Sequence, residues 1–281
     1  MQLVSFQDIA SRYKAIFFDS YGVLKNSKGI IPGISQTFAF LKEHQIEHYL
    51  LTNDASRSPE QLATNYQSYG ISEITEDRII SSGMLALDFL DQKVTGGTVA
   101  YLGTEGSAHY VEMKGIKTVP VRDIDLDRSA DVNALVFLDD EGFDWSVDLT
   151  HAVNLLRKQN MPVIVANTDY TYPVGKSDVA IAVGSLAYMI EKIVGKKFIR
   201  FGKPDTQIFQ FAFEHIQMHG PIERKDILMV GDTLKTDILG GNKFGIDTCL
   251  VLTGNTLASK ASLKIESSGI IPDFVCDSVV G

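Results

Sequence analysis

The chain has few cysteines, and its first residues do not resemble an export signal. Its 281 residues include only two cysteines, Cys249 and Cys276, too few for the disulfide framework of a small secreted protein. Neither belongs to a metal-binding cysteine pair, and this usage is typical of a reducing compartment. The opening residues lack the basic region and the long apolar core of a signal peptide. We therefore expect a cytoplasmic protein.

Long hydrophobic runs and a surplus of positive charge are also missing. Apolar runs such as 134–138 and 163–166 are far too short to span a bilayer. The formal net charge is −9, whereas nucleic acids and anionic membranes are bound by basic surfaces. We therefore expect neither as a partner. A small phosphorylated molecule is compatible with this charge, because a few fixed donors and one metal ion can hold a phosphate. The oligomeric state stays open, a homo-oligomer included.

What the sequence does have is a regular alternation of short apolar runs and helical patterns. Apolar residues make up 44% and charged residues 22%, as in an ordinary globular protein, and the length suits one large domain or two. This alternation is typical of a largely parallel sheet covered by helices. We expect strands at 14–18, 47–51, 226–230 and 248–252. We expect helices after Pro32-Gly33, from Ser58-Pro59 to Gly70 with the stripe Leu62, Tyr66 and Tyr69, from Asp205, and over 236–244.

The middle of the chain has the pattern of a separate α/β unit. Strands are expected at 98–102, 133–138 and 162–166, with a helix carrying Leu149, Val153 and Leu156 before the last of them. From about Val183 the first pattern resumes. We therefore predict a doubly wound, Rossmann-like α/β core with a largely parallel sheet, formed by residues 1–85 and 182–281. An inserted α/β cap, residues 86–181, interrupts it.

Aspartates follow two of the expected core strands. Asp19 comes directly after the strand at 14–18, and Asp232 and Asp237 flank the loop after the strand at 226–230. Open α/β sheets place their active sites at the carboxyl ends of strands, so we expect three carboxylates at one edge. Each alone could also cap a turn or a helix. Together they repel one another unless a cation neutralises them, and such oxygen ligands suit Mg²⁺.

Candidate phosphate-binding groups lie in two further segments, 49–54 and 200–205. Thr52 and Asn53 come just past the strand at 47–51, where a hydroxyl and backbone amides are suitable donors for phosphate oxygens. In isolation a plain turn would explain them equally well. Lys203 lies between Gly202 and Pro204 at a fixed bend, and the helix behind it presents free N–H groups. These groups add phosphate binding to the expected metal site.

These four segments, in this order, resemble the four motifs of the haloacid dehalogenase superfamily, whose members are mostly Mg²⁺-dependent phosphatases. The Gly-Lys-Pro and Gly-Asp-x-x-x-Thr-Asp patterns, with a cap between the second and third motifs, are similar to the class IIA subgroup. That subgroup includes p-nitrophenyl, pyridoxal phosphate and nucleotide phosphatases. Other stretches also resemble it: Ser81-Ser82-Gly83, Leu102-Gly103-Thr104-Glu105-Gly106 and Asn167-Thr168-Asp169.

The resemblance implies a role for each motif residue. Asp19 would attack phosphorus and form an aspartyl-phosphate. Mg²⁺ would bind the carboxylates of Asp19 and Asp232 and the backbone carbonyl of Tyr21, with Asp237 close by, directly or through water. The phosphoryl oxygens would be held, and their charge offset, by the remaining motif residues: Thr52, the Asn53 amide and Lys203.

The first motif departs from the family's pattern at Tyr21. The family's phosphatases carry a second aspartate there, which protonates the leaving oxygen and then activates water. A phenol with a pKa near ~10 is a weak acid at neutral pH and a poor proton acceptor. Losing a well-placed acid–base group typically costs roughly 10²–10⁴ in rate. Asp54 is a candidate replacement, and the alternative is that it caps the next turn.

Three functions are compatible with this pattern, and the first is the one we predict. It is a Mg²⁺-dependent phosphatase acting on a small phosphorylated metabolite such as a sugar phosphate. The second is a catalytically impaired homologue that binds a phosphorylated ligand. The third is a 2-haloacid dehalogenase, whose first motif is also similar to Asp-x-Tyr-Gly, but Asp232 and Asp237 point to phosphate.

Four cap residues are expected either to contact the leaving group or to serve ordinary packing: Asn167, Asp169, Tyr170 and Tyr172.

Overall fold

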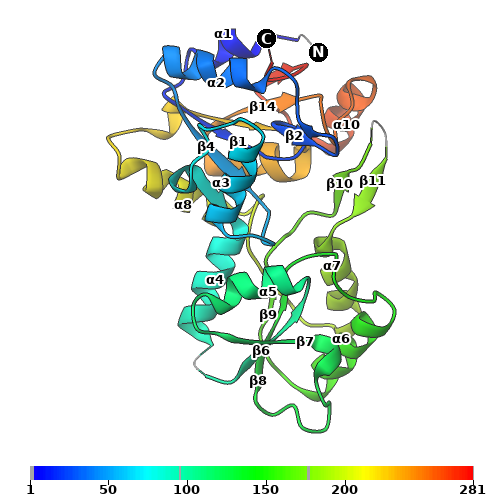
Figure 1. Cartoon of the computed structure of the whole chain (residues 1–281). Coiled ribbons are helices and arrows are strands. Elements are labelled where there is room, and N and C mark those ends of the chain that lie inside the picture. The colour runs from blue at the N-terminus through cyan, green and yellow to red at the C-terminus, as the bar shows by residue number, and fades with distance from the viewer. Residues whose placement is uncertain (1–2, 95, 176–177, 281) are drawn as a thin grey trace.

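The computed structural model describes residues 3–94, 96–175 and 178–280. The chain forms two lobes, each built on a parallel sheet (Figure 1). Both chain ends belong to the lobe that contains β1, β4 and β14, and the helix α4 (Ser82–Lys93) leads from this lobe to the other. No helix within the described ranges is both long and apolar enough to cross a membrane.

The core sheet has six parallel strands in the order β15-β14-β13-β1-β4-β5. Side chains of β1 alternate between two hydrophobic clusters, with Phe17 in one and Ile16 and Phe18 in the other, as expected for a strand buried on both faces. The strands are β1 (Ala15–Phe18), β4 (Glu47–Thr52), β5 (Ile79–Ser81), β13 (Ile227–Gly231), β14 (Asp247–Val251) and β15 (Phe274–Cys276).

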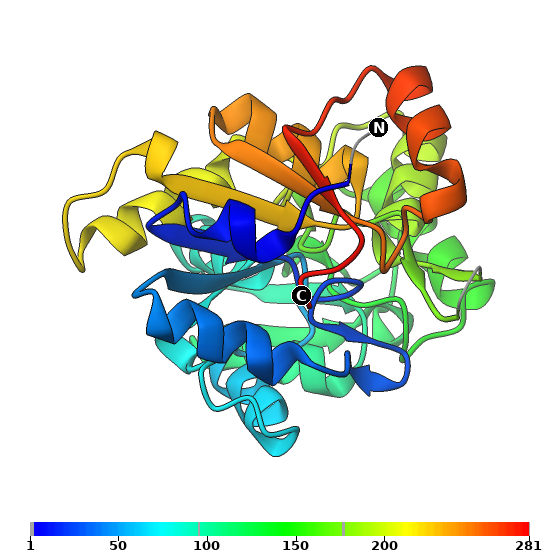
Figure 2. The same ribbon diagram turned by 90° about the horizontal axis from the view of Figure 1, so that it is seen from above.

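Helices cover both faces of the core sheet, as Figure 2 shows from above. The cluster around Phe18 includes residues of α1 (Phe6–Ala10), α2 (Ile34–Glu43) and α3 (Pro59–Ser68). The cluster around Phe17 includes residues of α8 (Thr206–Gln217) and α9 (Leu239–Phe244). A further helix, α10 (Ala261–Ser268), packs beside β14 through Ala261. The predicted doubly wound α/β fold is confirmed.

Local signals account for the start and end of α3. Ser58 accepts a hydrogen bond from the Gln61 backbone, the Gln61 side chain accepts one from the Ser58 backbone, and Pro59 is the first helical residue. This capping box is one of the strongest sequence signals of a helix start. The expectation for Tyr69 was wrong: its side chain is 62% exposed. The helix ends at Ser68, so Tyr69 lies beyond the buried stripe.

The second sheet has five parallel strands in the order β12-β9-β8-β6-β7. One face packs against α6 (Val147–Lys158) and α7 (Val183–Val194). The other face packs against α4 and α5 (Glu105–Glu112), and this cluster continues into the core lobe. The strands are β6 (Thr98–Leu102), β7 (Lys117–Pro120), β8 (Val132–Phe137), β9 (Val163–Val165) and β12 (Ile199–Arg200).

Residues 183–200, which we expected in the core, belong with the second sheet. α7 packs against this sheet, and β12 pairs with β9. The chain therefore returns to the core lobe after Arg200 rather than near 182. The division into a core domain and an inserted cap stays our proposal, with the return moved to this point. We call the second sheet, its helices and the paired strands β10 (Thr171–Pro173) and β11 (Val179–Ile181) the cap.

Shorter elements complete the two lobes. The predicted helix at 236–244 is a π-helical turn, η4 (Leu234–Ile238), followed by α9. Among the described residues, short antiparallel pairs are formed by β2 (Lys25–Asn26) with β3 (Gly29–Ile30), and by β10 (Thr171–Pro173) with β11 (Val179–Ile181). Four 3₁₀ turns are η1 (Glu76–Arg78), η2 (Val121–Asp123), η3 (Arg224–Asp226) and η5 (Ala258–Lys260).

Candidate active site

Three aspartates meet at the carboxyl edge of the core sheet. Asp19 directly follows β1, Asp232 directly follows the neighbouring strand β13, and Asp237 lies in η4. One carboxylate oxygen from each lies within 4.8 Å of the others. The residues Asp232 and Asp237 are each 1% exposed, whereas the Asp19 side chain is 15% exposed. A bound molecule would therefore reach Asp19 first.

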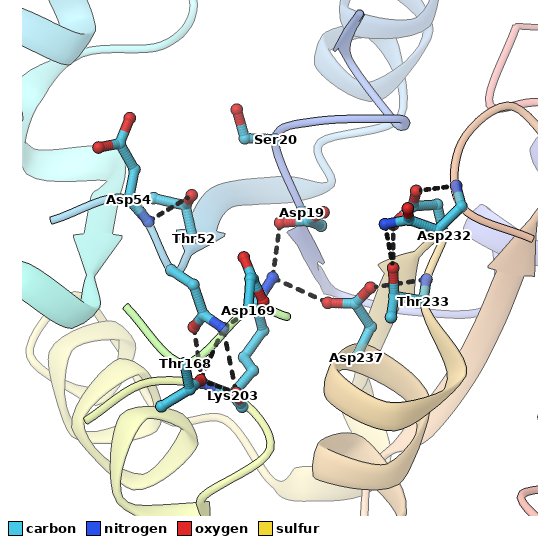
Figure 3. A network of polar contacts seen from close by, with 12 residues as sticks. Asp19, Ser20, Thr52, Asp54, Thr168, Asp169, Lys203, Asp232, Thr233 and Asp237 are labelled. Carbon is cyan, nitrogen blue, oxygen red and sulfur yellow. Dashed lines mark hydrogen bonds and ion pairs between the residues drawn. The ribbon is translucent and has the colours of Figure 1, made fainter. Parts of the chain in front are cut away.

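Lys203 connects two of these aspartates (Figure 3). Its Nζ atom lies 2.6 Å from Asp19 Oδ1 and 2.8 Å from Asp237 Oδ1, and its side chain is 2% exposed. Burial acts to lower the pKa of this ammonium, but the two carboxylates outweigh burial and raise it. The Asn53 side chain helps to position this segment, because Asn53 Oδ1 accepts a hydrogen bond from the Lys203 backbone at 2.7 Å.

Without a further cation, the ionised forms of the two buried aspartates are disfavoured. Burial raises the pKa of Asp237 to about 7, with Lys203 acting against the rise. Burial, together with repulsion from Asp19 and Asp237, raises the pKa of Asp232 well above its usual range. Three carboxylates and one ammonium leave a formal surplus of two negative charges. The cluster is therefore electrostatically suited to a divalent cation.

Hydrogen bonds orient these carboxylates and leave one buried oxygen paired with Lys203 alone. Asp232 Oδ1 accepts from Thr233 Oγ1 at 2.8 Å and Oδ2 from the Asn255 backbone at 2.5 Å. Asp237 Oδ2 accepts from the Thr233 backbone at 3.0 Å. Asp237 Oδ1 is buried and lies 2.8 Å from Lys203 Nζ, and no other described residue donates a hydrogen bond to it. A buried carboxylate oxygen in this state suits a metal ligand.

Gly22 allows the loop after Asp19 to approach Asp232. Its φ is +84°, and a side chain at this position would overlap the Asp232 carboxylate and the Gly254 backbone. Only glycine combines this conformation with so close an approach. The loop that begins with Asp19 is therefore packed directly onto the buried carboxylate, with Tyr21 next to the contact.

Tyr21 faces the cap. Its ring lies 6.2 Å from the ring of Tyr172, edge to face, and the Tyr172 hydroxyl donates to Asp140 Oδ2 at 3.1 Å. Lys25 Nζ lies 5.9 Å from the centre of the Tyr21 ring. Burial raises the pKa of Tyr21, so its phenol is a weaker acid here than in water. The residue that stands in place of the family's second aspartate thus makes contact with the cap.

Thr52 and Asn53 are almost fully buried at the end of β4, with exposures of 4% and 2%. The Asn53 side chain joins the two lobes. Its Nδ2 atom donates to Asp169 Oδ1 at 2.8 Å, to the Lys203 carbonyl at 3.0 Å and to Thr168 Oγ1 at 3.1 Å. The role expected for Asn53 concerns its backbone amide. These side-chain contacts were not predicted.

Asp54 has the contacts of a turn-capping residue. Its Oδ1 atom accepts from the Ser56 backbone at 2.9 Å and from the Ser56 hydroxyl at 2.6 Å. Arg57 lies 3.8 Å from its other oxygen. In Figure 3 the Asp54 carboxylate points away from Asp19. The structure thus favours the capping alternative over the acid–base role considered for Asp54.

The carboxyl edge of the cap sheet faces the same site. β9 leads to Thr168 and Asp169, and Thr168 Oγ1 donates to the Lys203 carbonyl at 2.6 Å. Burial raises the pKa of Asp169 to about 6, with Lys203 acting to lower it and Asp19 to raise it. Of the other cap candidates, Tyr172 contacts Tyr21, whereas Tyr170 is 50% exposed.

Sequence reasoning missed Asp140, Thr168 and Asn255 as site residues. For the first two a signal existed: each follows a short apolar strand, as Asp19 does. For Asn255, which bonds to Asp232 through its backbone, no local pattern indicates the contact.

Comparison with known proteins places the chain among hydrolases. A family model described as haloacid dehalogenase-like hydrolase matches residues 16–117, and a HAD-hydrolase-like model matches residues 200–281. A crystal structure from Cytophaga hutchinsonii, described as a possible sugar phosphatase of the HAD superfamily, is 57% identical. That match covers 100% of this chain and 99% of the other, with a TM-score of 0.95.

Two curated relatives match over nearly their whole length. The ribonucleotide monophosphatase NagD of Escherichia coli K12 is 28% identical, over 92% of this chain and 96% of its own. An acid sugar phosphatase of Staphylococcus saprophyticus is 25% identical, over 93% of each chain. The similarity therefore spans both lobes.

Proposed function

Because the chain belongs to the haloacid dehalogenase superfamily, we propose that it hydrolyses the phosphate ester of a small metabolite at Asp19. It is a phosphoric monoester hydrolase, of the sugar-phosphate or nucleotide type to which its relatives belong. Within that range we propose a sugar phosphate. The single observation that carries the assignment of the site is the pairing of Lys203 with both Asp19 and Asp237.

Asp19 is proposed as the nucleophile. It is the partly exposed member of the carboxylate cluster, and the Lys203 ammonium fixes one of its oxygens at 2.6 Å. In the proposed reaction the free oxygen attacks phosphorus, the ester bond breaks, and an aspartyl-phosphate forms on Asp19. Water then hydrolyses this intermediate and restores the carboxylate.

Mg²⁺ is proposed as the cofactor, held by the carboxylates of Asp19, Asp232 and Asp237 and by the Tyr21 carbonyl. The donor set supports this ion: it consists of oxygen atoms alone, carries two surplus negative charges and includes Asp237 Oδ1, which is buried with Lys203 as its partner. When bound, Mg²⁺ would supply positive charge to the phosphoryl oxygens.

The phosphoryl group is proposed to bind between the two lobes. Thr52 and the Asn53 amide would donate hydrogen bonds to its oxygens, and Lys203 would offset the charge that develops during transfer. The near-complete burial of all three side chains supports this, since donors held in place lose little entropy on binding.

The test is hydrolysis of p-nitrophenyl phosphate, with and without Mg²⁺, by the wild type, by Asp19→Asn and by Tyr21→Asp. We expect Mg²⁺-dependent release of nitrophenol, a loss of at least roughly 10³-fold in Asp19→Asn, and a gain in Tyr21→Asp. Asp91→Asn, an exposed position of α4, is the matched control and should behave as the wild type.

Measurements of phosphate binding and of dehalogenation, made beside this assay, separate the alternatives. If the wild type binds phosphate in a Mg²⁺-dependent way but releases no nitrophenol, even in a first turnover, the protein is a ligand-binding homologue. Dehalogenation of a 2-haloacid without phosphatase activity would overturn the assignment to phosphate esters.

A further inference from the structure

The reaction proposed above needs a proton donor for the leaving group, and Tyr21 is a poor one. We propose that Asp169, contributed by the cap, transfers this proton in place of the carboxyl group missing at position 21. This inference rests on the proposed phosphatase function and adds a catalytic residue to it. Asp169 is placed for this role by the topology of the cap sheet, by its hydrogen bonds and by its charged neighbours.

The topology brings Asp169 to the phosphate-binding residues. β12 and β9 are parallel neighbours, so their carboxyl ends lie at the same edge of the cap sheet. β12 leads to Lys203, and β9 leads to Thr168 and Asp169. Figure 3 shows Asp169 beside Lys203 and below Asp19. Asp169 thus lies where a phosphate ester held by Lys203 would extend toward the cap.

The hydrogen bonds of Asp169 hold the carboxyl group and leave one oxygen available. Asn53 Nδ2 donates to Asp169 Oδ1 at 2.8 Å. The Asp169 backbone N–H donates to Asn167 Oδ1 at 2.9 Å, which orders the loop. Within the described part of the chain no hydrogen bond goes to Asp169 Oδ2. This oxygen can therefore carry the proton while Oδ1 stays bound.

The charges around Asp169 favour a carboxyl group that changes its protonation state near neutral pH. Lys203, Asp19 and Asp54 are the charged groups that act on it. Burial, the largest influence, raises its pKa to about 6. A phosphate dianion bound beside it would favour the protonated form further, because like charges repel. An acid with a pKa of about 6–7 suits proton transfer at neutral pH.

The other carboxyl groups near the site fit the role less well. Asp54 is bound twice by Ser56 and points away from Asp19. Asp139, at the end of β8, also has its pKa raised by burial to about 6, but the charged groups acting on it are Asp140, Asp54 and Glu141. Neither Asp19 nor Lys203 is among them, whereas both act on Asp169.

The proposed proton transfers balance over the two steps. In the first, Asp19 bonds to phosphorus, the bond to the leaving oxygen breaks, and this oxygen takes the proton of Asp169. An alcohol leaves, and Asp169 is a carboxylate. In the second, a water molecule gives one proton to Asp169 and bonds to phosphorus, the bond to Asp19 breaks, and phosphate leaves.

The decisive variant is Asp169→Asn, because asparagine keeps an oxygen to accept the bond from Asn53 but cannot transfer a proton. With a sugar phosphate, whose alcohol is a poor leaving group, we expect turnover to fall by roughly 10²–10⁴. With p-nitrophenyl phosphate, which needs little acid help, we expect a first-turnover burst of nitrophenol followed by slow turnover. Labelled phosphate should stay on the protein during the slow phase.

A second variant distinguishes proton transfer from mere positioning. In the Tyr21→Asp background the family's usual acid is restored, so Asp169→Asn should then cost less than about tenfold. A purely structural role of Asp169 would cost the same in both backgrounds. Thr168→Val breaks a neighbouring contact with the Lys203 carbonyl without removing a carboxyl group, and it should lower the rates with both substrates by the same factor.

Several results would overturn the proposal. Asp169→Asn could match the wild type with both substrates, or lose equal activity with both and show no burst. Asp54→Asn could reproduce the expected pattern instead. These outcomes are distinct from failure of the phosphatase function itself, in which the wild type releases no nitrophenol and Asp19→Asn makes no difference.

Discussion

The two sheets meet with their carboxyl edges at the site, and the aspartates at the two edges have different partners. At the core edge, Asp19 and Asp237 are both paired with the ammonium of Lys203. At the cap edge, Asp169 is held by the Asn53 amide and Asp140 by the Tyr172 hydroxyl. Burial raises pKa values at both edges, but among the described residues only the core edge has a cation in direct contact with its aspartates.

This difference separates two uses of the same side chain. A group of carboxylates around one ammonium, with a surplus of negative charge, is suited to hold charge and to bind a metal ion. A single carboxyl group with a neutral partner and a raised pKa is suited to give and take a proton. The comparison predicts that substitutions at the core edge alter stability and metal binding, and that those at the cap edge alter the leaving-group step or substrate affinity.

The largest effect is expected for Lys203→Met. The substitution leaves Asp19 and the buried Asp237 without their cation, which typically costs about 3–5 kcal/mol in the free energy of unfolding. Denaturant unfolding in the absence of Mg²⁺ measures this. Lys25→Met is the comparison variant, because the Lys25 ammonium lies over the rings of Tyr21 and Tyr66. Equal stability of Lys203→Met and the wild type would contradict the ion-pair description.

The next effect is expected from pH on the metal-free protein. The pKa values of Asp232 and Asp237 are raised in the folded state, that of Asp237 to about 7. The folded state therefore binds protons more tightly than the unfolded chain, so stability should fall as pH rises from about 4 to about 7. The proposed Mg²⁺ would bind the carboxylate forms, and its addition should remove this decline.

The measurement is the unfolding temperature between about pH 5 and about pH 8, with chelator and with Mg²⁺. The decline should be present only with chelator. Asp232→Asn removes one of the two groups, and the decline should become shallower. A metal-free protein whose stability rises over this range would contradict the assigned direction of both pKa shifts.

The smallest effect is expected at the cap edge, for Tyr172→Phe. The substitution removes the hydroxyl that donates to Asp140 but keeps the ring against Tyr21. We expect the hydroxyl to orient Tyr172 for contact with the leaving group. Losing one partly exposed hydrogen bond, which contributes about 0.5–1.5 kcal/mol, should therefore raise the KM for a sugar phosphate by at most about tenfold while kcat changes little. Tyr172→Ala also removes the ring and should raise KM further. If both variants keep the KM of the wild type, Tyr172 does not contribute to substrate affinity.

Much of the fold follows from local patterns. The strand β1 is a short apolar run, and α3 begins at a capping box that the sequence displays directly. The assignment of residues 183–200 could not be made in this way. α7 has an apolar stripe that would cover either sheet equally well, and β12 is only two residues long. Which sheet they join depends on the strand that pairs with β12, and this is a long-range contact.

The site residues likewise divide into those that local patterns predicted and those that long-range contacts bring together. The positions after the strands led to the expectation that Asp19, Asp232 and Asp237 share one edge, because parallel strands end together. Lys203 reaches them from the other sheet, since it follows β12. The bonds of Asn53 were not foreseen. They join it to Asp169 and to the Lys203 carbonyl, which lie 116 and 150 residues away in the chain. No spacing rule connects positions so far apart.

The sequence by itself determined the alternation of strands and helices, the carboxylates after two core strands and the tyrosine at position 21. These features are local, because they depend on residue type and on neighbours within one strand or turn. The tertiary structure decided which carboxylates are paired with Lys203, which one the cap brings to Asn53, and how far burial raises each pKa. Burial and charge pairing arise only when distant segments come together, so the chemistry of each aspartate depends on the folded arrangement.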